Sequence, residues 1–308
     1  MTTPDYSTTR SLTREKPACF DSLTVGLPTW LKTPDSEHKI DEGGLRLQGL
    51  YKSSSEDYPL ITIVTVVYNG VAFLEDTIKS IIEQTYENVE YVIVDGGSND
   101  GSVDIIKKYE YAIDYWVSEK DNGISDAFNK AIKLSTGVYI NFQGDGDGFC
   151  CRNSLKDVFF DLNTEQVMFV SARIQRITGN GEIIYNSKFI SSFKKRYLLF
   201  KMSMPHQGLF THREYFSKYG LFALDNKFCM DYEHLLRSYK YFPKVVTVNV
   251  VAAYWRSDGI GNGKTLEVLQ EYDKIKRKNR VASPVLLYII HYWSLFKFIV
   301  KKGLTLGK

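Results

Sequence analysis

Apolar runs alternate with amphipathic segments between residues 59 and 143. The first run, PLITIVTVVYN (59–69), is short, rich in β-branched residues and left through Asn69-Gly70, which is typical of a buried strand. Segment 71–85 then places apolar residues at helical spacing. The same two patterns recur and predict strands at 89–95, 112–119 and 137–143 and helices at 103–109, where Ser102 is the expected N-cap, and at 123–135.

This alternation predicts an α/β fold with a mostly parallel central sheet and right-handed crossovers. In such sheets ligands bind beyond the carboxyl ends of the strands. Those ends are polar, glycine-bearing loops here, at 67–69, 95–98, 119–123 and 143–147. We therefore expect the four loops to converge on one crevice.

The second half of the chain is less regular. It predicts strands at 167–177 and 181–190, a helix at 214–220 that Gly220 stops, a helix at 231–242 and a strand at 244–255. We expect an N-terminal extension at 1–58, partly irregular, with Trp30, Leu31 and Leu45–Leu50 docked on the domain. The main domain would cover 59–272 and a helical tail 273–308.

The tail concentrates the basic charge of the chain. The net charge is +3, yet nine Lys/Arg and no Asp/Glu follow Asp273, which leaves 30 basic and 36 acidic residues upstream, or −6. Between Val285 and Phe296 the tail is apolar and aromatic, but too short to span a bilayer. Basic flanks around such a stretch favour an amphipathic helix in a membrane interface. The alternative is a helix packed on the domain with a solvated basic face. No nucleic-acid-binding fold accompanies the tail, so we expect no nucleic-acid partner.

The composition, 44% hydrophobic and 24% charged, is that of an ordinary globular protein. The four cysteines match neither a disulfide framework nor a zinc knuckle, and we expect reduced thiols. The first residues, MTTPDYSTTRSLTREK, lack the apolar core of a secretion signal. These features predict a cytoplasmic protein.

Phosphate-binding glycine loops are missing where they would be expected. The first strand–helix turn, VVYNGVAF, lacks G-x-G-x-x-G, and the chain has no G-x-x-x-x-G-K-[ST]. If the crevice holds a nucleotide, something else must neutralise its phosphates. Asp145 and Asp147 follow the fourth strand within GDGDG, and Mg²⁺ or Mn²⁺ takes one or two such carboxylates together with substrate phosphates. An isolated D-x-D is most often a turn. Phe149 argues against an EF-hand, because it stands where the next oxygen ligand belongs. The metal prediction therefore rests on the position of the two aspartates beside the other strand ends.

Two further carboxylates follow strands in the same crevice. Asp95 and Asp121 are candidates for nucleotide contacts, and Asp100 is a weaker one that could simply belong to a turn. Asp126 and Lys130 lie four residues apart on the third helix, which also fits a plain helical ion pair.

Several long motifs, in order, carry a resemblance. ITIVTVVYNG, YVIVDGGSNDGS, SEKDNGISDAFNKAIKLSTGVYINF and the D-x-D resemble the donor half of glycosyltransferase family 2, which has the Rossmann-like GT-A fold. PHQGLFTHREYFSKYGLF, CMDYEHLLR and YWRSDGIGN are similar to the acceptor half of its bacterial colanic-acid, O-antigen and capsule members. The resemblance covers roughly residues 59–265 and implies an inverting, Mn²⁺- or Mg²⁺-dependent transfer from a nucleotide-diphosphate sugar.

The resemblance also implies roles for residues. Asp145 and Asp147 would bind the metal, Asp147 directly, and Asp231 would be the general base. Inversion needs one carboxylate to accept the proton of the acceptor hydroxyl, while a metal stabilises the leaving diphosphate. Glu233 is the alternative base, and Arg256 and Asp258 are weaker donor-site candidates. The expected nucleotide-sugar site comprises Thr65, Val67, Tyr68, Asn69, Asp95, Ser98, Asp121, Gly123, Asp126, Lys130, Asp145 and His206.

The chain departs from the family pattern at Gly148, where many members carry another Asp, and it lacks the Q-x-x-R-W of processive synthases. We therefore expect the addition of a single sugar, with a UDP-sugar favoured as donor. The expected acceptor is a saccharide or lipid-linked saccharide at the inner face of the cell membrane. A sugar-nucleotide nucleotidyltransferase and an inactive nucleotide-sugar-binding scaffold remain alternatives.

Overall fold

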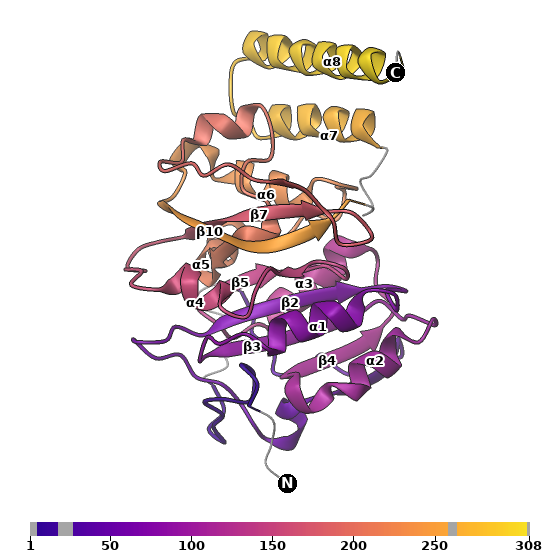
Figure 1. Cartoon of the computed structure of the whole chain (residues 1–308), viewed down its shortest axis with the longest axis vertical. Coiled ribbons are helices and arrows are strands. Elements are labelled where there is room, and N and C mark those ends of the chain that lie inside the picture. The colour runs from indigo at the N-terminus through magenta and orange to yellow at the C-terminus, as the bar shows by residue number, and fades with distance from the viewer. Residues whose placement is uncertain (1–4, 18–26, 258–263, 307–308) are drawn as a thin grey trace.

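A large mixed sheet forms the centre of the protein in the computed structural model, which describes residues 5–17, 27–257 and 264–306, with side chains as far as residue 300. Within these residues ten strands form the sheet, in the order β1-β4-β3-β2-β5-β9-β7-β10-β6, with β8 paired to β7 (Figure 1). The strands are β1 (Lys39–Gly43), β2 (Ile61–Val67), β3 (Val89–Asp95), β4 (Tyr115–Glu119), β5 (Tyr139–Phe142), β6 (Gly148–Phe149), β7 (Phe169–Ile177), β8 (Ile183–Asn186), β9 (Leu209–His212) and β10 (Val245–Arg256).

The first half is the predicted parallel α/β unit. β4, β3, β2 and β5 pair in parallel, and every residue of β2 and β3 is buried, as their unbroken apolar runs require. Helices cover both faces. α1 (Leu74–Ile82) and α2 (Ser102–Lys108) share one apolar core, and α3 (Ile124–Leu134) packs into the other. The carboxyl ends of the four strands therefore lie along one edge, where a ligand site is expected.

The second half makes the sheet mixed. β9 runs antiparallel between β5 and β7, and β10 is parallel to β7 but antiparallel to β6. Neither β6 nor β9 was predicted, so the mostly parallel sheet is confirmed for the first half only. The helices here are α4 (Ser154–Phe159), α5 (Arg213–Tyr219) and α6 (Met230–Arg237).

The N-terminal segment is fastened to the main domain at several points. β1, which was not predicted, pairs antiparallel with β4 and extends the sheet. The backbone N–H of Trp30 donates to the carbonyl of Lys133 (2.7 Å), and Leu45 is buried, as the predicted docking requires. Arg46 forms a fully buried ion pair with Glu90 of β3 (2.6 Å). The segment thus contributes to the core of the molecule.

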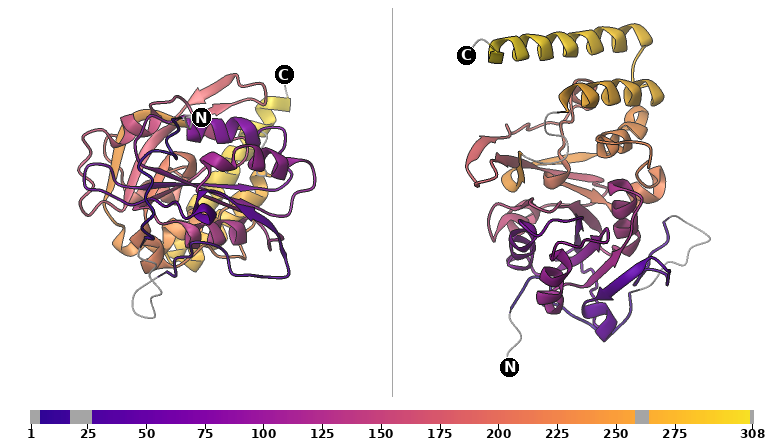
Figure 2. Two further views of the ribbon diagram at one scale, coloured as in Figure 1. Left: turned by 90° about the horizontal axis from the view of Figure 1, so that it is seen from below. Right: turned by 90° about the vertical axis from the view of Figure 1, so that its right-hand side faces the viewer.

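The C-terminal tail forms two helices, α7 (Thr265–Lys278) and α8 (Pro284–Leu306). α7 packs on α6, and α8 runs back alongside α7 at the end of the molecule opposite the N-terminal segment (Figures 1 and 2). Leu287 and Ile290 of α8 join the core beside α6 and α7, while a row of large apolar side chains faces away from it: Val285, Tyr288, Ile289, Tyr292, Trp293, Phe296 and Ile299. None of the helices in the described part of the chain is long and apolar enough to cross a membrane.

Candidate active site

The loops after β2 (68–73) and β3 (96–101) are joined by hydrogen bonds, and the two loops together are called the ledge below. The N–H of Asn69 donates to Ser98 Oγ (2.8 Å), and the N–H of Asn99 donates back to Asn69 Oδ1 (3.0 Å). The N–H of Gly70 donates to Ser102 Oγ (3.0 Å). The prediction that Ser102 is the N-cap is therefore wrong. Gly101 occupies the N-cap position, while the Ser102 hydroxyl bridges the two loops.

Three of the predicted nucleotide ligands have buried side chains. Asp95 is fully buried, and its Oδ2 accepts hydrogen bonds from the N–H of Ser98 (2.9 Å) and from Ser118 Oγ (2.6 Å). The Thr65 hydroxyl is bonded to the Tyr91 hydroxyl (3.0 Å), and Val67 is buried. Direct contacts from these buried side chains to a nucleotide stay a prediction.

Tyr68 and Asp121 come together beside Gly96. The Tyr68 ring is 65% exposed, although it lies at the end of a fully buried strand. A Cβ atom at Gly96 would lie 2.6 Å from Asp121 Oδ2 and 3.4 Å from the Tyr68 ring. The N–H of Gly123 donates to Asp121 Oδ1 (2.8 Å) and fixes the carboxylate. An exposed ring and a carboxylate thus flank the bare backbone of Gly96, which suits the face and the N–H edge of a planar base.

Lys130 forms ion pairs within the protein. Its Nζ lies 2.7 Å from Glu119 and 3.6 Å from Asp126. Asp126 also accepts from the N–H of Asn122 (3.0 Å). The helical ion pair that was the alternative interpretation is what the structure contains. Asp126 and Lys130 therefore stabilise the start of α3, and a nucleotide contact from them stays a prediction.

Asp145 and Asp147 lie on a turn between β5 and β6, held against α1. Thr77 Oγ1 donates to the carbonyl of Asp147 (2.7 Å) and accepts from the N–H of Gly146 (3.0 Å), whose φ of 87° favours glycine. The surrounding protein and the charge of Asp147 raise the pKa of Asp145 to about 6. Burial also raises the pKa of Asp147, against the opposing effect of His206. Two neighbouring carboxylates repel each other when both are charged, and a bound cation would offset that repulsion.

Gln207 connects this turn to the second half of the site. Its Nε2 donates to Asp147 Oδ2 (2.9 Å). Two buried amides, one in β5 and one directly after it, hold the segment that carries it. Asn141 Nδ2 donates to the carbonyls of His206 (3.2 Å), Gln207 (3.1 Å) and Leu209 (3.0 Å), and Gln143 Nε2 donates to that of Gln207 (2.9 Å). Sequence reasoning missed these positioning residues. The signal was two amides at alternate positions of an otherwise apolar strand.

His206 and Asp231 meet across 25 residues of sequence. His206 Nδ1 lies 3.3 Å from Asp231 Oδ2, and the Asp231 side chain remains 23% exposed. Burial alone would lower the pKa of His206, but the carboxylates of Asp231 and Asp147 outweigh it and raise the pKa. The side chain of His206 thus faces both the D-x-D turn and Asp231.

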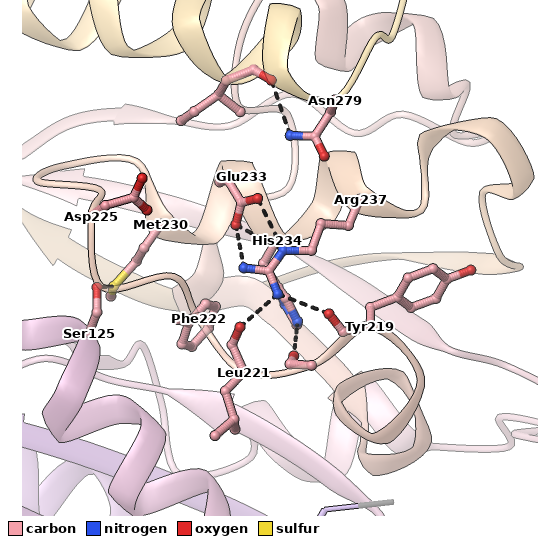
Figure 3. A network of polar contacts seen from close by, with 12 residues as sticks. Ser125, Tyr219, Leu221, Phe222, Asp225, Met230, Glu233, His234, Arg237 and Asn279 are labelled. Atoms are coloured by element: carbon pink, nitrogen blue, oxygen red, sulfur yellow. Dashed lines mark hydrogen bonds and ion pairs between the residues drawn. The ribbon is translucent and has the colours of Figure 1, made fainter.

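Glu233, the alternative base, is engaged in an ion pair. Its carboxylate is buried and forms a bidentate ion pair with Arg237, whose Nη1 also donates to the carbonyls of Tyr219 (2.9 Å) and Leu221 (2.7 Å) (Figure 3). This network fastens α6 to the end of α5. Asp231 is therefore the carboxylate of α6 that faces the site.

Arg256 closes the crevice on the side of α1. Its guanidinium lies over the ring of Phe73 (4.1 Å to the centroid), and its Nη1 donates to the carbonyl of Gly179 (2.7 Å). Its Cδ would lie 3.2 Å from a Cβ atom at Gly146. Arg256 therefore sits beside the D-x-D turn, where a cation suits a diphosphate. Asp258, the other weak candidate, lies outside the described residues.

α7 braces the segments that carry Asp231 and His206. Both carboxylate oxygens of Glu271 accept backbone N–H groups, from Lys227 (2.7 Å) and Phe228 (3.0 Å), just before α6. The ring of Tyr272 packs on that of Tyr232 (4.3 Å between centroids). Lys276 Nζ donates to the carbonyl of Leu199 (3.4 Å). The tail thus supports the reactive half of the site.

A metal would have to share its coordination with a substrate. No cluster of three or more His, Cys, Asp or Glu side chains able to hold a metal exists among the described residues. Mg²⁺ and similar ions, however, commonly bind through one or two carboxylates plus substrate phosphates. Asp145 and Asp147, with their raised pKa values, fit that pattern.

Comparison with known proteins decides the family. Residues 62–220 match the model of glycosyl transferase family 2, which is more than half of the chain. The chain belongs to glycosyltransferase family 2. A PGL/p-HBAD biosynthesis glycosyltransferase of Mycobacterium bovis (strain BCG / Pasteur 1173P2) is 26% identical over 243 residues, covering 76% of this chain and 91% of the relative. TuaG of Bacillus subtilis (strain 168), whose name assigns it to teichuronic acid biosynthesis, is 36% identical over 93 residues, or 29% and 36% of the two chains.

Solved glycosyltransferases share the fold. The mannosyltransferase PcManGT from Pyrobaculum calidifontis, in complex with GDP-Man and Mn²⁺, superposes with a TM-score of 0.56 at 20% identity and covers 77% of this chain and 69% of its own. S. aureus TarS 1-349 in complex with UDP-GlcNAc gives 0.58 at 14% identity, covering 77% and 71%. The GT-A fold predicted from the sequence is confirmed, and this family 2 member is a glycosyltransferase.

Proposed function

We propose that this protein is an inverting, metal-dependent glycosyltransferase that adds one sugar to a saccharide or lipid-linked saccharide in the biosynthesis of a bacterial surface polysaccharide. The observation that carries the proposal is the pairing of two separate carboxylate sites in one crevice. Asp145 and Asp147 lie on the donor side, and Asp231 lies beyond them on α6, with His206 in contact with Asp231.

Asp231 performs the proton transfer. It accepts the proton of the acceptor hydroxyl while that oxygen bonds to the anomeric carbon and the bond from that carbon to the diphosphate breaks. His206 holds the Asp231 carboxylate in place through Nδ1. Because Glu233 is committed to Arg237, α6 offers one carboxylate for this step, which fits a single-displacement inversion.

The donor occupies the ledge and the D-x-D turn. The base lies over Gly96 between Tyr68 and Asp121, and a UDP-sugar is the favoured donor. The diphosphate lies between Arg256 and the two aspartates, which would hold Mn²⁺ or Mg²⁺. When bound, that ion acts as a Lewis acid on the leaving diphosphate. Gln207 keeps Asp147 oriented.

The tail attaches the enzyme to the inner face of the cell membrane. The outward row of α8, with Ile289 and Trp293 among its members, is apolar, and no acidic residue follows Asp273. Such a helix lies in the interface and is attracted by anionic lipids. Membrane attachment fits a lipid-linked acceptor, as in O-antigen or capsule assembly.

A donor screen tests the function. UDP-, GDP- and dTDP-sugars are added to the purified protein with Mn²⁺ or with EDTA, and the thermal midpoint and the release of nucleotide are followed. At a hundredfold excess over Kd, the matching donor raises the midpoint by about 5–10 °C, and only with the metal.

The alternatives give different results in the same screen. Donor binding without transfer or hydrolysis under any condition would indicate a nucleotide-binding scaffold. Formation of a nucleotide sugar from a nucleoside triphosphate and a sugar phosphate would indicate a nucleotidyltransferase, which the non-basic turn VVYNGVAF argues against.

A further inference from the structure

A second cleft opens next to the His206 segment, on the acceptor side of the sheet. The space between its walls, open solvent at the mouth included, is about 400 Å³. β7, β10, the segment after β8 and the segment before His206 enclose it. The lining residues are Ser171, Ala172, Arg173, Ser187, Lys188, Phe189, Ile190, Phe193, Ser203, Pro205, Thr247 and Val248.

The cleft carries positive charge that the protein does not neutralise. Arg173 Nε donates to the carbonyl of Ser187 (2.7 Å) and Nη1 to Asn249 Oδ1 (3.0 Å), so both partners of this half-buried guanidinium are uncharged. Among the described residues neither Arg173 nor Lys188 forms an ion pair, and the lining contains no acidic side chain. A partly desolvated guanidinium is stabilised by a carboxylate or phosphate, which it can bind with two parallel hydrogen bonds.

The rest of the lining suits a sugar. Ser171, Ser187 and Thr247 add hydroxyl groups to the walls. Ser203 Oγ is buried and has no hydrogen-bond partner in the described part of the chain. Phe189 and Phe193 provide apolar surface for the C–H face of a pyranose ring.

The cleft adjoins the proton acceptor. Pro205 forms part of its wall and directly precedes His206, which contacts Asp231. β7 approaches the same segment so closely that a Cβ atom at Gly208 would lie 2.7 Å from the carbonyl oxygen of Ala172. A saccharide held in the cleft would therefore lie next to the segment that carries His206, the contact of Asp231.

We propose that this cleft is an acceptor subsite for an anionic saccharide, with Arg173 and Lys188 binding a phosphate or carboxylate attached to the sugar. The inference rests on the proposed function and makes it more specific. The phosphate arises from a lipid-diphosphate sugar and the carboxylate from a uronic acid, and the experiment below separates these two sources.

The test uses three ligands with the same ring and different charge: methyl β-glucoside, methyl β-glucuronide and α-glucosyl phosphate. Each is titrated into the full chain by protein-observed NMR, with the donor site filled by UDP and Mn²⁺ and again without them. We expect at least one anionic sugar to bind at least about tenfold more tightly than the neutral sugar, and increasingly weakly as salt rises. A preference for the phosphate favours the lipid-diphosphate source, and a preference for the glucuronide favours the uronic acid.

The variant Arg173→Gln/Lys188→Gln should abolish the preference and leave the affinity for UDP unchanged. The control Lys156→Gln/Lys240→Gln removes the same charge from exposed sites and should change neither. Equal binding of the three sugars, no detectable sugar binding, or a preference that survives in the Arg173 and Lys188 variant would overturn the proposal. If the wild-type protein neither hydrolyses any donor nor binds UDP, the proposed function is refuted instead. The titrations without UDP would still test the cleft.

Discussion

Metal binding should depend on pH through Asp145. Its pKa of about 6 comes from the surrounding protein and from the charge of Asp147, and a cation has to displace any proton on this carboxylate. The ionised fraction falls from about nine tenths at pH 7 to about one tenth at pH 5. The apparent affinity for Mn²⁺ should therefore fall about tenfold through Asp145 alone. This is an upper value, because solvent around the exposed side chain of Asp145 weakens the effects that raise its pKa.

The assay is titration of Mn²⁺ into the protein saturated with UDP, followed by electron paramagnetic resonance at pH 5, 6 and 7. Asp145→Asn should bind Mn²⁺ weakly at every pH and lose most of the pH dependence between 5 and 7. Asp157→Asn, an exposed carboxylate on α4, should behave as the wild-type protein does. A wild-type affinity that is constant from pH 5 to 7 would refute the assignment of Asp145 to the metal.

Three further predictions follow from particular contacts. Arg46→Met should lower the free energy of unfolding in urea by about 3–5 kcal/mol, because it leaves Glu90 charged and buried, and the further change Glu90→Leu should restore much of it. Glu271→Gln should reduce kcat about tenfold with an unchanged Kd for the donor, because Glu271 accepts two backbone N–H groups just before α6. Glu271→Asp, which keeps the carboxylate, should be slowed less. An equal loss in both variants, or a loss of donor affinity, would argue against a positioning role. Ile289→Glu/Trp293→Glu should reduce binding to phosphatidylglycerol vesicles at least about tenfold without changing the thermal midpoint, and unchanged sedimentation with vesicles would contradict the membrane role of α8.

The sequence predicted those elements whose own residues determine them. β3 has the predicted bounds because all seven residues of VEYVIVD are buried between neighbouring strands. β6 and β9 were missed since they have two and four residues and exist through their partners. β1, KIDEG, has no apolar pattern and depends on pairing with β4. Ser102 has the composition of a cap, but tertiary contact with Gly70 decides its role.

The site follows the same division. The positions of Asp121, Asp145 and Asp147 at strand ends could be predicted, since topology alone brings those ends together. The contact of His206 with Asp231 depends on packing between distant segments, and so does the hydrogen bond from the amide of Asn141 to the His206 segment. The ion pair of Lys130 with Glu119 of β4 could not be predicted either, because it joins a helix to a strand and lies outside any helical spacing.

The central claim is that Asp231 is the base of an inverting sugar transfer. Its most direct test is the turnover of the matching nucleotide sugar by Asp231→Asn, with Asp225→Asn, an exposed carboxylate just before α6, as the control. Asp231→Asn should lower kcat by about 10²–10⁴-fold with an unchanged Kd for the donor and a fully wild-type thermal midpoint, while the control keeps its rate. Wild-type turnover by Asp231→Asn would contradict the account.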